Sequence, residues 1–180
     1  MINFGHFIYG AAPRTGVVWF VKACEASGLA PPPWDEPFDP PKRSTVATVT
    51  VIRHPYTWLV SYYLAYRGAS DVSPSVDQFA KYARMAADSK RFIELVLKHQ
   101  PDAVSQMFDS YKADIVMRLE DMPWALVQFL DSLEDPRIDS AGAQYTLPVN
   151  VMPRVHPRDR KQAAAVVAAN ADFCERYEYT

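Results

Sequence analysis

The chain has 180 residues, of which 49% are hydrophobic, and these values predict a single globular domain over residues 1–180. The formal net charge of −2 argues against general nucleic-acid binding. Two cysteines, Cys24 and Cys174, are too far apart in sequence to indicate a metal-ligand pair or a disulfide framework, which favours a reduced intracellular protein.

The N-terminal residues lack the basic stretch and long apolar run of a signal peptide. No window approaches the roughly 20 apolar residues that a membrane-spanning helix needs. We therefore expect a cytoplasmic protein that does not associate with membranes.

Strands and helices alternate in the first 70 residues. An apolar strand over 3–9 precedes a helix over 16–28, whose apolar residues recur at helical spacing. Six prolines within 31–41 exclude a helix or central strand there and predict an extended surface loop. The β-branched run 45–52 predicts a buried parallel strand, and a helix opened by a proline covers 55–68.

The rest of the chain is predicted to be mostly helical. The expected elements, in order, are helices over 75–111 with breaks near Ser89 and Pro101, a strand over 114–119, a helix opened by residues 120–123, an irregular stretch over 135–158 and a final helix over 159–173.

Strands separated by helices predict an α/β fold with a small parallel sheet and helices on both faces. In such sheets ligands bind at the carboxyl ends of the strands. The loops that begin at Gly10, Arg53 and Glu120 are therefore the ones expected to carry function.

The loop from Gly10 to Gly16 has the outline of an anion-binding loop. It joins a strand to a helix N-terminus, where backbone N–H groups and the helix dipole favour negative charge, and Arg14 adds a guanidinium group. A Walker A loop ends in Gly-Lys-Ser/Thr, but here Val17 and Val18 follow Gly16. Metal-dependent ATP or GTP hydrolysis is thus disfavoured. An ordinary strand-to-helix turn is the alternative.

The second loop places Arg53 directly after a predicted buried strand, with Ser61 two turns into the following helix. Both residues could contact an anion at the same sheet edge. The alternative is that Arg53 is an ion-pair partner and Ser61 a small packing residue. His54 is expected to cap or pack against the helix, and His6, within the first strand, to lie in the core.

Together the segments PRTGVVW (13–19) and VIRHPYTWLVSYY (51–63) resemble the sulfotransferases that use 3′-phosphoadenosine 5′-phosphosulfate (PAPS). The resemblance implies a P-loop NTPase-like three-layer sandwich and no metal. It implies that Arg53 and Ser61 bind the 3′-phosphate, and that the 5′-phosphosulfate is bound by Pro13, Arg14, Thr15, Gly16, Val17 and Val18.

Three later segments extend the resemblance. MRLEDMP (117–123) is similar to the family's strand that ends in a Glu-Asp pair, and PVNVM (148–152) and ERYEY (175–179) fall where short members carry related motifs. The family often closes the 3′-phosphate site with a basic loop near the C-terminus, a role the resemblance gives to Arg154 or Arg158. Arg118 and Glu120 are interpreted as structural.

The chain also departs from the family's pattern. Val17 and Val18 stand where the family keeps two threonines, so two hydroxyl donors to the phosphosulfate are missing. No residue maps by motif onto the family's catalytic base. Asp35 and Glu36 lie in the interval where that base usually occurs and are the candidate bases, although solvated loop carboxylates are the alternative.

The resemblance implies transfer of a sulfuryl group to a hydroxyl or amine of a small-molecule or glycan acceptor, with Arg14 as a catalytic residue. Aromatic residues at 34, 38, 56, 58 and 62–66 line an acceptor pocket or belong to the core. Two alternatives are a non-catalytic nucleotide-binding protein on the same fold and an atypical P-loop kinase.

Overall fold

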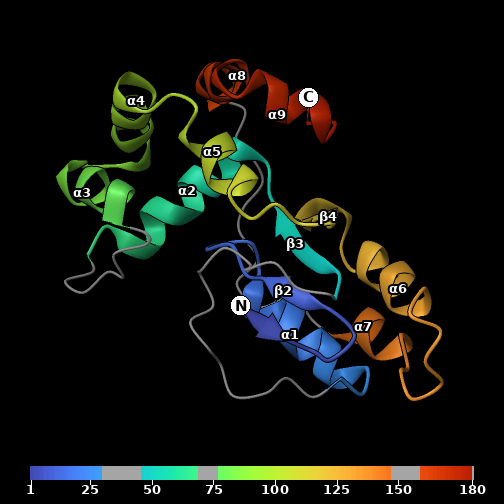
Figure 1. The fold of residues 1–180 in the computed structure, drawn as a ribbon. Coiled ribbons are helices and arrows are strands. Elements are labelled where there is room, and N and C mark those ends of the chain that lie inside the picture. The colour runs from blue at the N-terminus through green and yellow to red at the C-terminus, as the bar shows by residue number, and fades with distance from the viewer. Residues whose placement is uncertain (30–45, 69–76, 147–158, 180) are drawn as a thin grey trace. The chain divides into compact units, whose positions relative to one another are not determined.

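The computed structural model of the protein describes residues 1–29, 46–68, 77–146 and 159–179 (Figure 1). The chain divides into two compact units. The first comprises Met1–Ile52 and Tyr111–Val151, and the second comprises Arg53–Ser110 and Met152–Thr180. The second unit begins directly after a strand of the first.

The described residues of the first unit form a four-stranded sheet. Its strands are β1 (Ile2–Asn3), β2 (Ile8–Gly10), β3 (Thr48–Ile52) and β4 (Ile115–Arg118). They lie in the order β1-β2-β3-β4, with β1 antiparallel to β2, and with β2–β3 and β3–β4 parallel. The sheet is thus mixed, in contrast to the predicted all-parallel sheet.

The prediction of one strand over 3–9 was wrong because the chain reverses at Gly5. Gly5 has φ 83°, in the left-handed region that glycine adopts readily, and its N–H donates to Asn3 Oδ1 over 2.8 Å. The Phe4 N–H then donates to the Phe7 carbonyl over 2.9 Å, which closes the turn. The apolar run is therefore a hairpin whose first arm is the edge strand β1.

β3 is central, and all five of its residues are buried, as its β-branched sequence predicts. The Asp114 carboxylate accepts hydrogen bonds from the Thr48 backbone N–H (2.7 Å) and hydroxyl (2.8 Å). These bonds lower the pKa of Asp114 and join the start of β3 to the residue that precedes β4.

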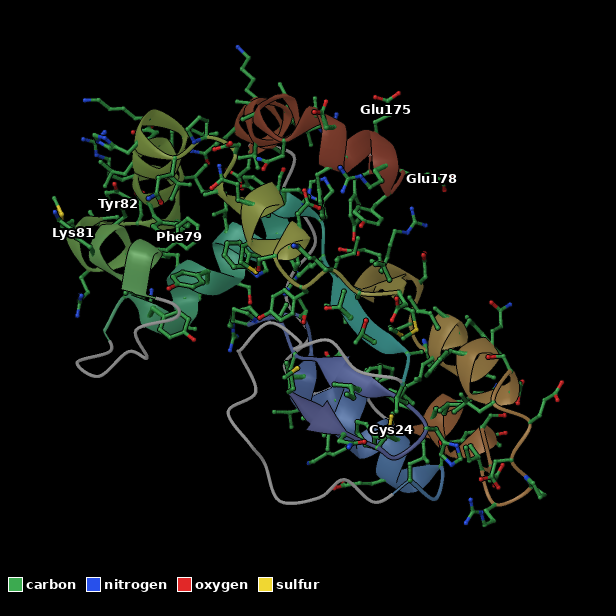
Figure 2. All side chains as sticks on the ribbon, in the orientation of Figure 1. Cys24, Phe79, Lys81, Tyr82, Glu175 and Glu178 are labelled. Carbon is green, nitrogen blue, oxygen red and sulfur yellow. The ribbon has the colours of Figure 1, made fainter. Side chains whose placement is uncertain are left out.

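Among the residues that the structure describes, three helices supply the core of the first unit together with the sheet: α1 (Val17–Ala26), α6 (Trp124–Asp131) and α7 (Ala141–Tyr145). The Phe7 ring meets Phe20 and Phe129 edge-on, at centroid distances of 6.3 and 4.9 Å. Cys24 of α1, labelled in Figure 2, is buried as a free thiol. α7 falls in the stretch predicted to be irregular, so that prediction was wrong for 141–145.

His6 is not a core residue of this unit. It is half-buried, and its Nε2 lies 3.1 Å from the Asp135 carboxylate. Asp135 also accepts hydrogen bonds from Arg137, and these hold its pKa well below the usual range. The sequence interpretation of His6 as core was therefore wrong.

The described residues of the second unit are mainly helical. Their helices are α2 (Pro55–Tyr66), α3 (Asp77–Met85), α4 (Ser89–His99), α5 (Ala103–Asp109), α8 (Arg160–Ala169) and α9 (Ala171–Arg176). The bounds of α3, α4 and α5 confirm the predicted breaks near Ser89 and Pro101, and the Asp88 carboxylate accepts from the Arg91 N–H (2.8 Å) to cap α4. Trp58 of α2 is fully buried against Phe79, which Figure 2 labels, and Phe108.

The predicted C-terminal helix is interrupted at Asn170, which separates α8 from α9. The Asn170 side-chain oxygen accepts from the Ser105 N–H (3.0 Å) and hydroxyl (2.7 Å), and its amide donates to the Pro101 carbonyl (3.2 Å). A buried asparagine with these partners fixes the C-terminal helices to the start of α5.

The fold is therefore α/β, with a small mixed sheet. Within the ranges that the structure describes, no helix is long and apolar enough to cross a membrane.

Candidate functional site

The first candidate site is the loop between β2 and α1, in the first unit. Ala11, Ala12 and Thr15 are fully buried, whereas Arg14 is half-buried. The loop therefore lies on the core, and its arginine reaches toward the surface.

The backbone of this loop is held in an uncommon conformation. Arg14 has φ 64° and Gly16, the N-cap of α1, has φ 81°. A left-handed conformation costs a non-glycine residue about 1–2 kcal/mol. At Arg14 it therefore has to be enforced by the surrounding structure, and such residues cluster at functional sites. The first helical hydrogen bond runs from the Phe20 N–H to the Gly16 carbonyl (2.9 Å). The N–H groups of Val17 and Val18 precede it and point out of the helix end.

Two buried threonine hydroxyl groups donate hydrogen bonds to carbonyl groups of the loop. Thr50 Oγ1 donates to the Gly10 carbonyl and Thr15 Oγ1 to the Ala12 carbonyl, both over 2.7 Å. The Thr15 hydroxyl thus supports the loop, so its contribution to ligand binding is expected from its backbone N–H. These bonds fix the loop before any ligand binds.

Tyr9, the residue before Gly10, places a fully buried phenol beneath the loop. Its ring stacks on Phe20 at a centroid distance of 4.0 Å. Burial raises the pKa of Tyr9, and the nearby Thr15 hydroxyl opposes that rise in part. Across the described ranges its hydroxyl makes no hydrogen bond of good geometry. The phenol therefore stays protonated as a buried donor under the loop.

The two valines that replace threonines are not equivalent. Val17 is half-buried and packs against the core of the first unit, whereas Val18 is 50% exposed. Position 18 is therefore better placed than position 17 for a side-chain contact with a ligand.

The second candidate site is in the other unit, where Arg53 follows β3 directly. Arg53 is only 9% exposed and Ser61 only 1%. Arg53 Nε donates to Thr57 Oγ1 over 3.1 Å. His54 caps α2, and its Nδ1 accepts from the Tyr56 N–H over 3.2 Å. The predicted role of His54 as a helix cap is confirmed.

Sequence reasoning did not single out Thr57. It lies four residues after Arg53 and four before Ser61, and residues four apart share one face of a helix. That spacing, in a helix otherwise rich in aromatic residues, is the signal that could have found it.

At the end of β4 the structure places charged residues that bond to each other. Arg118 donates to both carboxylate oxygens of Asp121, with Nε over 2.6 Å and Nη2 over 2.9 Å. This local pair fits the structural interpretation of Arg118. Glu120 is exposed.

The aromatic side chains of α2 are mainly core. Tyr56, Trp58, Tyr62 and Tyr63 are each at most 4% exposed, whereas Tyr66 is half-buried. This burial favours the packing interpretation over the acceptor pocket for those four.

Several predicted site residues lie outside the described ranges. They are the candidate bases Asp35 and Glu36 and the candidate phosphate ligands Arg154 and Arg158. The remaining predicted residues fall in two groups, with 13–18 in the first unit and Arg53 and Ser61 in the second.

The part of the chain that the structure describes contains no group of three or more His, Cys, Asp or Glu side chains arranged to hold a metal ion. Comparisons with protein-family models, with curated proteins and with solved structures found no match to this chain.

Proposed function

We propose that the protein is a sulfotransferase that uses PAPS as donor, on a P-loop NTPase-like fold. The observation that carries the proposal is the β2–α1 loop, with Arg14 at φ 64° and Gly16 at φ 81° ahead of the α1 N-terminus. A rigid loop with outward N–H groups and an arginine is suited to the oxygens of a phosphosulfate.

Each part of the donor has a candidate partner. Arg14 and the N–H groups of residues 15–18 bind the 5′-phosphosulfate. Arg53 and Ser61, both buried polar residues, bind the 3′-phosphate. Arg154 or Arg158 adds a further positive charge there. The fork of a guanidinium group matches phosphate geometry, which supports an arginine at each anion.

The reaction is an in-line displacement at sulfur. The acceptor oxygen or nitrogen forms a bond to sulfur while the bond from sulfur to the bridging phosphate oxygen breaks, and that oxygen keeps the electron pair. Arg14 and the loop N–H groups stabilise the charge that develops on the leaving phosphate. Asp35 or Glu36 takes the proton that the acceptor loses.

Ligand-induced stabilisation tests donor recognition. Adenosine 3′,5′-bisphosphate, the product of the donor, should raise the melting temperature of the wild-type protein. At 100 times the Kd the gain is about 2.7 kcal/mol, which corresponds to several degrees. Arg53→Ala and Arg14→Ala should each remove most of the shift.

Arg67→Ala is the matched control, because Arg67 is exposed at the end of α2 and lies 6.0 Å above the Tyr63 ring. It should keep the full shift. No shift of the wild-type protein at millimolar bisphosphate would refute the proposal.

A non-catalytic nucleotide-binding protein is the second candidate, and Val17 is the observation that favours it. Its side chain packs against the apolar core of the first unit, and the site lacks the threonine hydroxyl that the resemblance places at position 17. Bisphosphate binding without transfer of sulfate from PAPS to any acceptor in a panel of phenols, sugars and amines would favour this candidate.

A further inference from the structure

α2 carries a polar stripe on an otherwise apolar helix. Thr57 and Ser61 are one helical turn apart, and a hydrogen bond joins Thr57 to Arg53. Ser61 is buried and Thr57 half-buried, and the other buried residues of α2 are Pro55, Tyr56, Trp58, Leu59, Tyr62 and Tyr63. Placing polar side chains next to such a core is costly unless they are hydrogen-bonded, so the stripe needs a structural or functional reason.

The Thr57 hydroxyl both donates and accepts a hydrogen bond. Its proton is donated to the His54 carbonyl over 3.0 Å, and its oxygen accepts from Arg53 Nε over 3.1 Å. A hydroxyl carries one proton, and an arginine nitrogen can only donate, so the direction of both bonds is fixed. Thr57 therefore ties the arginine side chain to the backbone of the α2 N-cap.

We infer that Thr57 is a positioning residue that orients Arg53 for a phosphomonoester, and this inference rests on the proposed function. The guanidinium group is planar, so fixing Nε fixes the plane in which the two terminal nitrogens lie. Recognition of the phosphate then falls to the edge formed by Nη1 and Nη2. Holding this edge in place before binding removes part of the entropy that a long side chain would lose.

Two substitutions at one position separate orientation from packing. Thr57→Val keeps the shape of the side chain and removes the hydroxyl, whereas Thr57→Ser keeps the hydroxyl. Each variant is titrated by calorimetry with adenosine 3′,5′-bisphosphate and with adenosine 5′-monophosphate, which lacks the 3′-phosphate. Urea unfolding of both variants measures any loss of stability.

The expected result is a loss of affinity confined to the bisphosphate. Thr57→Val should raise its Kd about tenfold, the effect of one hydrogen bond to a charged group. Thr57→Ser should stay within about threefold of the wild-type Kd. The Kd of the monophosphate should not change in either variant.

Three outcomes would overturn the inference. An unchanged bisphosphate Kd in Thr57→Val would show that Arg53 does not need the tether. An equal loss for both nucleotides would indicate a purely structural role. Wild-type protein that binds the bisphosphate no tighter than the monophosphate would refute the 3′-phosphate site itself, and the inference with it.

Discussion

The Gly16 Cα faces the Leu119 side chain so closely that a Cβ on Gly16 would lie 2.9 Å from Leu119 Cδ1. Gly16 caps α1, and Leu119 directly follows β4. The contact packs the last residue of the candidate anion loop against the residue that follows β4.

Gly16→Ala should destabilise the protein by about 1–3 kcal/mol in urea unfolding, because φ 81° is strained for alanine and the new Cβ meets Leu119. Adding Leu119→Ala should relieve only the steric part. A double-mutant cycle should therefore give a coupling of at least about 0.5 kcal/mol. Strict additivity would contradict the close approach of the two residues.

Gly142→Ala should cost about 1–3 kcal/mol of stability, because a Cβ on Gly142 would meet the Ala26 carbonyl oxygen and push α7 away from α1. Gly68→Ala is the matched control, since a Cβ there meets nothing within 4 Å, and its effect should be within about 0.5 kcal/mol. Equal effects in chemical denaturation would argue against the packing of α7 on α1.

Substituting threonine for each valine of the loop should have different effects on ligand affinity and on stability. Val18→Thr should tighten bisphosphate binding by up to about tenfold, because the exposed position 18 can offer a hydroxyl to the ligand. Val17→Thr should give no gain and should lower stability by about 1–2 kcal/mol, since position 17 packs against apolar side chains. Calorimetry measures the affinity and urea unfolding the stability of both variants. Tighter binding by Val17→Thr without tighter binding by Val18→Thr would show that position 17, and not position 18, contacts the ligand.

Tyr56 should give the second unit a distinct alkaline transition. Burial, together with the nearby Asp159 carboxylate, raises the pKa of Tyr56 to about 12. The pKa of a tyrosine in the unfolded chain is about 10. Between about pH 10 and pH 12 the unfolded chain therefore loses the Tyr56 proton before the folded protein does. The free energy of unfolding is thus unaffected by Tyr56 below about pH 10 and falls as the pH rises toward 12.

The test of this transition is an ultraviolet titration of tyrosinate, in which the wild-type spectrum is compared with that of Tyr56→Phe. Asp159→Asn should lower the pKa of Tyr56 only in part, because burial is the larger cause. A Tyr56 component that titrates near pH 10 in the wild-type protein would show that the phenol is solvated.

Local signals in the sequence were enough to predict much of the fold. The β-branched run marks β3, Pro55 marks the start of α2, and breaks near Ser89 and Pro101 separate α3, α4 and α5. The hairpin at Gly5 was missed because an uninterrupted apolar run resembles one strand, and a single glycine inside it is a weak signal. α7 was missed because five residues are too few for helical periodicity.

In the candidate site, the local structure was predictable where residue type and place along the chain were sufficient, as for the helix start after Gly16 and the His54 cap. The hydroxyl of Thr57 and the different surroundings of Val17 and Val18 depend on which way side chains point, and motif spacing does not carry that information. The burial of Tyr9 under the loop likewise depends on how α1 packs on β2.

Calorimetric titration with adenosine 3′,5′-bisphosphate in the presence of EDTA is the decisive measurement, because the proposed donor site recognises a 3′-phosphate without a metal. We expect the bisphosphate to bind in EDTA, ATP with Mg²⁺ not to compete with it, and Arg53→Ala to abolish binding. Binding of ATP that requires Mg²⁺, with no binding of the bisphosphate, would contradict the proposed donor recognition and indicate a P-loop kinase instead.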